Sequence, residues 1–117
     1  LTGHDVYNQA KFEDSIGIFP EFIDGKGHVV LPTTGRYFQV PYGSLVPTGV
    51  DNLLVAGRSI SGDETAHCAF RSMMCCTVSG QGAGTAAAVS LKAGVSTADV
   101  DIKAVQELLR LRGVMIL

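Results

Sequence analysis

The sequence predicts an α/β fold, and three stretches of the chain support this prediction. Residues 52–58, NLLVAGR, contain an unbroken apolar run, which is typical of a strand covered on both faces in a parallel sheet. Residues 72–91 contain no charged residue and carry small side chains at helical spacing, which predicts one long buried helix. Residues 17–47 alternate short β-like runs with Gly and Pro, which predicts a hairpin and an edge strand.

The composition indicates that these elements belong to a larger fold. The chain has 117 residues, of which 46% are apolar and 17% are charged, and the mean hydropathy is +0.27. Because the charged fraction usually lies near about 25%, we expect a segment outside these residues to cover part of the apolar surface. The chain begins at Leu1 without a Met or a signal-like stretch, so we interpret it as a fragment. The composition excludes intrinsic disorder, and a net charge of −2 argues against nucleic-acid and polybasic membrane binding.

The first 47 residues predict a short helix followed by β structure. Thr2 or Asp5 is a suitable cap for a helix within residues 1–16. Residues 28–31, HVVL, are a strand candidate in a glycine-rich hairpin region. Pro41 lies inside the next β-like run, and proline lacks a ladder donor, so this run is an edge strand or a strand that bends at Pro41.

A polar stretch follows the predicted strand 52–58. Residues 59–67, SISGDETAH, are expected to form a loop beyond the carboxyl end of that strand, where ligands bind in open α/β sheets. A helix is then expected over residues 69–92, with Gly94 as its C-terminal cap.

Every fourth residue of the long helix is small. The series is Ser72, Cys76, Gly80, Gly84 and Ala88. Side chains at i and i+4 stack on one face, and interior glycines cost about 1 kcal/mol each, so we expect this stripe to pack closely on a backbone or a flat ligand. A membrane span is disfavoured by the Ser, Thr and Gln residues. A phosphate loop is disfavoured because the glycine spacing is G-x-G-x-G rather than G-x-G-x-x-G.

Residues 94–117 predict an amphipathic helix that serves packing. Asp99 or Asp101 is placed to cap it, and Gly113 ends it. Its apolar face holds Val105, Leu108 and Leu109.

Candidate groups for chemistry lie near the start of the long helix. His67 and Arg71 are four residues apart, and a helix N-terminus beside a guanidinium favours an anionic ligand or a developing negative charge. Arg58 directly follows the glycine that ends the predicted strand. The structural alternatives are a hydrogen-bonded histidine and ion pairs of these arginines with Asp63 or Glu64.

The three cysteines predict neither a disulfide nor a metal site. Cys68, Cys75 and Cys76 are odd in number and include an adjacent pair, which is a poor disulfide framework. Their spacing does not match that of zinc ligands. We expect three small buried thiols in a reducing compartment, and therefore a cytoplasmic protein.

Three blocks of sequence together resemble a known family. They are VPYGSLVP at 40–47, DNLLVAGRSIS at 51–61 and, after Arg71, GQGAGTAA at 80–87. In this order and spacing they resemble the C-terminal end of FAD-dependent oxidoreductases of the FAD_oxidored type. These belong to the wider superfamily of fumarate-reductase- and glutathione-reductase-like flavoproteins.

The resemblance implies a division of the chain into three parts. Residues 1–47 would belong to a β-rich substrate domain, with a helix, a hairpin and an edge strand. Residues 48–93 would supply the terminal strand, the following loop and the long helix of a discontinuous FAD-binding domain. Residues 94–117 would form a C-terminal amphipathic helix.

The resemblance also implies FAD as the cofactor and hydride transfer between a small-molecule substrate and flavin N5. The implied cofactor-binding residues are Gly57, Arg58, Ser59, Arg71, Ser72, Met73 and Met74. His67 and Arg71 are implied as catalytic residues on the substrate side. The family holds the ADP half of FAD with an N-terminal G-x-G-x-x-G unit. These residues lack it, so the expected partner is that region of the same protein. The alternative function is a non-catalytic interaction or assembly module that docks through the small-residue helix.

Overall fold

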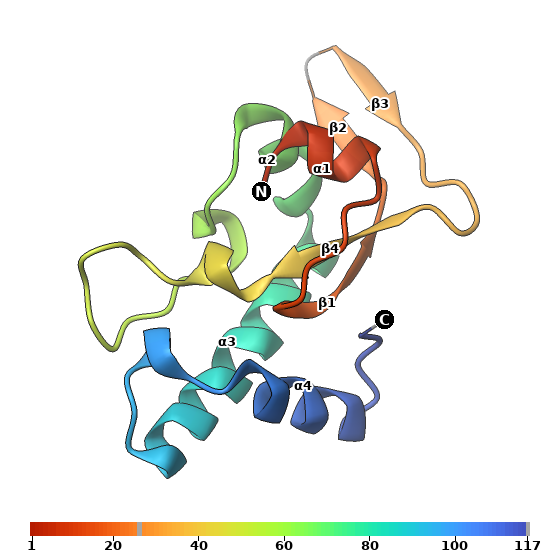
Figure 1. Ribbon diagram of the computed structural model, residues 1–117. Coiled ribbons are helices and arrows are strands. Elements are labelled where there is room, and N and C mark those ends of the chain that lie inside the picture. The colour runs from red at the N-terminus through yellow and green to blue at the C-terminus, as the bar shows by residue number, and fades with distance from the viewer. Residues whose placement is uncertain (26, 117) are drawn as a thin grey trace.

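Two antiparallel strand pairs and the helices around them make up the computed structural model, which describes residues 1–25 and 27–116 (Figure 1). Within these residues the α-helices are α1 (Gly3–Tyr7), α2 (Glu64–Phe70), α3 (Met73–Ala93) and α4 (Ile102–Leu111). The strands are β1 (Ser15–Pro20), β2 (Ile23–Gly25), β3 (His28–Val30) and β4 (Tyr37–Pro41). Short 3-10 helices cover Tyr42–Leu45, Gly57–Ser59 and Thr97–Asp99. The α/β class is therefore confirmed, with antiparallel strand pairs.

The pair β1–β4 forms the centre of the core. Phe19 lies opposite Phe38 in the antiparallel register, and the two buried rings meet edge to face with centroids 6.0 Å apart. β4 ends at Pro41, where the chain turns into a 3-10 helix, as the proline predicts. The pair β2–β3 contains the predicted strand at 28–31 and projects from the rest of the molecule (Figure 1).

One carboxylate holds the first turns of α1 and α2 together. Thr2 and Asp5 form a capping box at the start of α1, which confirms the predicted cap. Asp63 caps α2, with its Oδ1 accepting from the Ala66 N–H at 2.7 Å. Both carboxylate oxygens of Asp63 also accept from the Gly3 N–H at 3.0 Å.

The predicted strand at 52–58 is wrong for the part of the chain that the structure describes. Residues 53–56 are extended but belong to no strand pair, and Gly57–Ser59 is a 3-10 helix. The segment is fixed by the Val55 N–H donating to the Leu45 carbonyl at 2.8 Å, and Leu53 is 45% exposed. A strand needs a neighbouring strand for its ladder, and the described residues provide none beside this apolar run.

The predicted polar loop and long helix are also corrected. Residues 64–67 already lie in α2, so the loop after the 3-10 helix is shorter than expected. α3 begins at Met73 because Ser72 is extended (φ −63°, ψ 147°) and accepts from the Cys75 N–H at 3.4 Å as the N-cap. Its end is as predicted, with Gly94 in the left-handed conformation (φ 69°).

The small-residue stripe of α3 faces outward rather than into the chain's own core. A Cβ built at Gly80 or Gly84 has no neighbouring atom within 4 Å, and Ala88 is exposed. Four residues turn a helix by one turn and about 40° more, so a strict i+4 series winds away from a fixed face. The buried residues of α3 are Cys75, Ser79, Gly82, Thr85, Ala86 and Ser90. No helix within the described residues is long and apolar enough to span a membrane.

Gly82 is the glycine of α3 that packing requires. A Cβ at this position would meet the Ile16 side chain of β1, whose own Cβ lies 3.0 Å away. β1 and α4 both pack on α3, and α4 is capped by Asp101 as predicted. Val105 and Leu109 of α4 are fully buried. The division of the chain at residues 47 and 93 stays a prediction.

Candidate functional site

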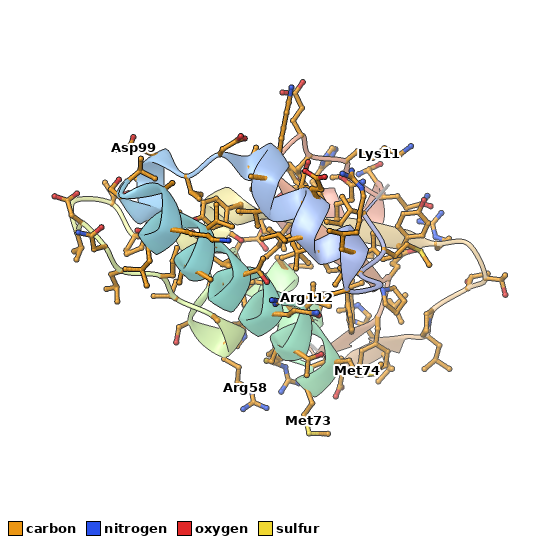
Figure 2. All side chains as sticks on the ribbon, turned by 90° about the horizontal axis from the view of Figure 1, so that it is seen from below. Lys11, Arg58, Met73, Met74, Asp99 and Arg112 are labelled. Atoms are coloured by element: carbon orange, nitrogen blue, oxygen red, sulfur yellow. The ribbon has the colours of Figure 1, made fainter. Side chains whose placement is uncertain are left out.

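Two neighbouring cavities open at the N-terminal end of α3. One has a volume of about 380 Å³ and the other of about 320 Å³, and they share Phe22, Ser72 and Met73 as walls. We call the pair the α3 groove. Its polar half is completed by Asp24, Arg58, Cys68 and Arg71, and its apolar half by Phe19, Pro20, Pro32 and Met74. Figure 2 shows the side chains of Arg58 and Met73 projecting from the same edge of the molecule.

The two arginines of the polar half are held in different ways. Arg71 donates to the Asp24 carbonyl at 2.8 Å, and its guanidinium lies 3.6 Å from the Asp24 carboxylate. Arg58 donates through Nε to the Arg71 carbonyl at 3.1 Å and has no carboxylate partner within the described residues. In place of the alternative ion pairs with Asp63 or Glu64, Arg71 pairs with Asp24 of β2 and Arg58 donates to the Arg71 carbonyl. Among the described residues of the groove, Arg58 therefore carries the uncompensated positive charge.

The first turn of α3 adds unpaired backbone donors. The first N–H groups of any helix have no intrahelical acceptor, and within the described residues those of Met73 and Met74 find none elsewhere. The helix dipole places partial positive charge at this end. Met73 and Met74 are 78% and 73% exposed, so this end of α3 lies at the surface beside the arginines.

A comparison with protein families matches residues 1–109 to the family described as FAD dependent oxidoreductase. The chain belongs to this family. The match confirms the resemblance on which the expected cofactor was based, and it supports a flavoprotein oxidoreductase role. No matching curated protein and no matching solved structure was found.

The groove of this FAD-dependent oxidoreductase domain fits part of a flavin in chemistry and size. Ligand sites commonly have volumes of about 300–1,000 Å³, with mostly apolar walls and a few placed polar groups. The apolar half offers a surface for a planar ring, and the unpaired amides of Met73 and Met74 offer donors to an anionic edge. Arg58, Arg71, Ser72, Met73 and Met74, all predicted from the resemblance, are brought together here.

Gly57 and Ser59 lie near the groove but do not line it. Gly57 has a positive φ of 66°, and its N–H donates to the Ser79 hydroxyl of α3 at 2.9 Å. A Cβ at Gly57 would have the Cys76 sulfur as its nearest atom, at an ordinary contact distance of 3.7 Å. There is room for a side chain, so it is the positive φ that favours glycine here. This bond fixes the 3-10 helix on α3 and so places the neighbouring Arg58 at the groove. Ser59 is exposed.

His67 is not part of the groove lining. It lies on α2, half-buried, with its ring edge to face on Phe70 at a centroid distance of 5.1 Å. The i, i+4 relation to Arg71 holds in the backbone, where the Arg71 N–H donates to the His67 carbonyl at 3.0 Å. The Arg71 guanidinium, however, is held at Asp24 of β2. The catalytic role of His67 therefore stays a prediction.

Several groove residues were missed in the sequence. They are Phe19, Pro20, Phe22, Asp24, Pro32 and Cys68. The first five come from the β1–β2 corner and the strand-like segment after β3, far from α3 in sequence, and no local spacing connects them with Arg58. They show that the N-terminal part of the chain builds half of the site.

The cysteines differ more than predicted. Cys75 is fully buried, and burial raises the pKa of its thiol to about 12. Cys68 and Cys76 are only half-buried, and all three are free thiols. Within the described residues, no group of three or more His, Cys, Asp or Glu side chains is arranged to hold a metal ion.

Proposed function

We propose that this chain forms the flavin-facing wall of an FAD-dependent oxidoreductase, with the isoalloxazine ring at the α3 groove. The observation that carries the proposal is the meeting of Arg58, Arg71 and the unpaired amides of α3 at one apolar-walled groove. When bound, FAD supplies hydride chemistry at its N5, and its reduced ring carries negative charge.

In this proposal each groove element has a distinct task. The N–H groups of Met73 and Met74 donate to the anionic edge of the ring, as preorganised donors do at positions where charge develops. Arg71 adds a fixed positive charge whose position is set by Asp24. Phe22 and the two methionines give the ring an apolar surface to pack on. We propose His67 as a further catalytic residue that reaches a small-molecule substrate from α2.

We further propose that a G-x-G-x-x-G region elsewhere in the same protein supplies the nucleotide grip. The glycines at 80, 82 and 84 lie in the middle of α3, where their amides serve the helix rather than a phosphate. Residues 53–56 are extended and pair with no strand among the described residues, and the outer face of α3 is uncharged and open at Gly80 and Gly84. Both features support an intramolecular sheet partner over this part of the molecule.

The same open α3 face supports the second candidate, a non-catalytic assembly module. That function predicts a partner chain on α3 and no flavin. Purification of the full-length protein, followed by a visible spectrum before and after reconstitution with FAD, separates the two. We expect flavin bands that bleach on reduction. The assembly module would be supported if the protein stays colourless after reconstitution and copurifies with a partner chain. The Gly84→Leu variant should then no longer copurify with that partner.

The 117 residues alone should not retain FAD stoichiometrically, because the proposed nucleotide grip lies outside them. Equilibrium dialysis of the isolated chain against FAD measures this. Tight stoichiometric binding of FAD by the isolated chain would contradict the proposal that the nucleotide is held by another region of the protein.

A further inference from the structure

We infer that a second copy of this chain docks on the surface between α3 and α4, so that the protein forms a two-fold symmetric dimer. This surface lies at the opposite end of α3 from the proposed flavin site. Met73 and Lys92 are roughly 28 Å apart along the helix axis, at about 1.5 Å a residue. A flavin at one end and a second copy at the other can therefore be bound at the same time.

A cavity of about 340 Å³ opens between α3 and α4, which Figure 2 shows side by side. We call it the α3–α4 cleft. Four of its lining residues are apolar and two are charged. They are Val89, Ala93, Ala104 and Leu108, with Lys92 on α3 and Glu107 on α4. An apolar surface with charged groups at its sides is typical of a contact between proteins.

α4 has two apolar faces, and only one of them is buried within the described residues. Val105 and Leu109 are fully buried where α4 packs on α3 and β1. Ala104, Leu108 and Leu111 lie on another face at the spacing i, i+4, i+7, and Leu111 is 76% exposed. This spacing is that of a seam between two packed helices. The occupant of the cleft should therefore present a helix.

The charges on the two sides of the cleft are self-complementary. Neither Lys92 nor Glu107 has an ionic partner among the residues that the structure describes. A two-fold axis along the cleft places α3 of one copy over α4 of the other, because the rotation exchanges the two sides. Lys92 of each copy then faces the partner's Glu107. A second copy thus satisfies the charges and the apolar seam together.

The dimer does not compete with the proposed intramolecular partner of α3. That partner is expected over Gly80 and Gly84. Ala93 follows Gly84 by about two and a half turns of the helix, so the two residues lie on opposite sides of α3. The α3–α4 cleft is therefore left open for a second copy.

Sedimentation velocity of the full-length protein tests the inference. We expect a dimer in the micromolar range that dissociates on dilution. Lys92→Glu and Glu107→Lys should each weaken dimerisation about tenfold or more, because like charges then face each other at two symmetry-related places. Lys11→Glu, at an exposed lysine outside the cleft, is the control and should leave the dimer unchanged.

An equimolar mixture of the two charge-reversal variants separates a broken contact from a misfolded chain. In a mixed dimer each contact again joins one positive and one negative charge, so the mixture should dimerise about as tightly as the wild type. On the apolar seam, Leu111→Ala should weaken the dimer about tenfold. Leu31→Ala, at a leucine of similar exposure (71%) outside the cleft, should not.

Three results would overturn the inference: a monomeric wild-type protein, an intact dimer in both charge-reversal variants, or a mixture that stays monomeric. A monomeric wild type would mean that another segment of the same protein covers the cleft. The flavin content of each preparation is a separate measurement. A dimer without bound FAD would contradict only the proposed function.

Discussion

Arg71 and Asp24 show how one residue pair adjusts the charge of a site. The guanidinium lies 3.6 Å from the carboxylate, and both side chains are about half exposed, so the pair itself stabilises the fold by less than about 1 kcal/mol. Its effect on a bound anion is different, because Asp24 offsets the positive charge that Arg71 presents to the groove. The two residues should therefore act on a flavin in opposite directions.

Arg71→Ala should lower the midpoint potential of the bound flavin, because a fixed positive charge beside the reduced ring is lost. Asp24→Asn should raise it, because the offsetting negative charge is lost. We expect shifts of about 30 mV in each direction, which corresponds to about 1.4 kcal/mol for a two-electron couple. Arg71→Lys should restore part of the potential, since a point charge replaces the planar fork of donors. Redox titration of the three full-length variants measures their midpoint potentials. Shifts of the same sign in Arg71→Ala and Asp24→Asn would contradict the placement of the flavin beside this residue pair.

Asp63 makes stability depend on pH at the acidic end. Hydrogen bonds from the backbone N–H groups of Ala66 and Gly3 lower the pKa of its carboxyl below the usual value. A carboxyl group with a lowered folded-state pKa stabilises the fold above its unfolded pKa of about 3.9, and this contribution is lost as the pH falls through the folded value.

Asp63→Ala should therefore cost about 1 kcal/mol at pH 7, the usual effect of losing an N-cap, and the difference from the wild type should shrink below about pH 4. Urea denaturation at several pH values gives the free energies of unfolding. Asp51→Ala, at an exposed turn residue, is the control and should show no such dependence. A difference that stays constant down to pH 2 would exclude the capping role.

At the scale of elements, the sequence predicts that α3 exists and where it ends, but it does not predict which face of the helix is buried in this chain. The uncharged stretch and Gly94 identify the helix, whereas the strict i+4 stripe does not mark the face that packs on β1 of this chain. The face is decided by Ile16 of β1, which packs on Gly82, and such a contact across more than 60 residues leaves no local signal. The break before Met73 did have a signal, since Ser72 is a good N-cap residue.

Gly82 and Gly84 should thus respond differently to the same small change. Gly82→Ala places a methyl group against Ile16 and should destabilise the protein by about 1–3 kcal/mol. Gly84→Ala meets no atom of the described residues and improves helix propensity, so it should be neutral or stabilising by up to about 1 kcal/mol. A loss at Gly84 in the full-length protein would instead report the proposed partner region packed on this face of α3. Thermal unfolding of the two full-length variants makes the comparison. Equal losses would mean that both glycines face tightly packed neighbours.

The candidate site was predictable on one side only. Arg58, Arg71, Ser72, Met73 and Met74 are implied by the family resemblance, and the structure places all five at the groove. The opposite wall is formed by residues of the predicted hairpin region, where the sequence shows no sign of a binding site. They are Phe19, Pro20, Phe22, Asp24 and Pro32. The predicted strand at 52–58 fails for a related reason, because an apolar run forms a strand only where a neighbouring strand completes its hydrogen bonds.

At the scale of the whole molecule, a few buried polar groups connect distant parts of the chain. Gln106 of α4 donates from Nε2 to the carbonyls of Glu13 at 2.8 Å and Ser15 at 2.9 Å. The Tyr42 hydroxyl donates to the Thr97 carbonyl at 2.6 Å. These bonds tie the β-rich segment to the C-terminal helices, although the sequence predicts them as separate parts.

Gln106→Met keeps the size of the side chain but removes the donor from two carbonyls. We expect a loss of about 1–3 kcal/mol in the free energy of unfolding, since buried acceptors are left without partners. Gln81→Met, at an exposed position of α3, is the matched control and should change stability by less than about 0.5 kcal/mol. Chemical denaturation measures the free energy of unfolding of both variants. Similar values would show that the two hydrogen bonds of Gln106 do not stabilise the fold.

The double cap at Asp63 has a consequence for the opening of α1. A helix of five residues is too short to be stable on its own. Here the Gly3 amide and the Ala66 amide share one acceptor, so α1 cannot detach without exposing the first turn of α2. Hydrogen–deuterium exchange should consequently find the two amides opening as one cooperative unit, with equal protection factors. The amides of α1 would then exchange as slowly as those of α2, to which α1 is bonded through Asp63.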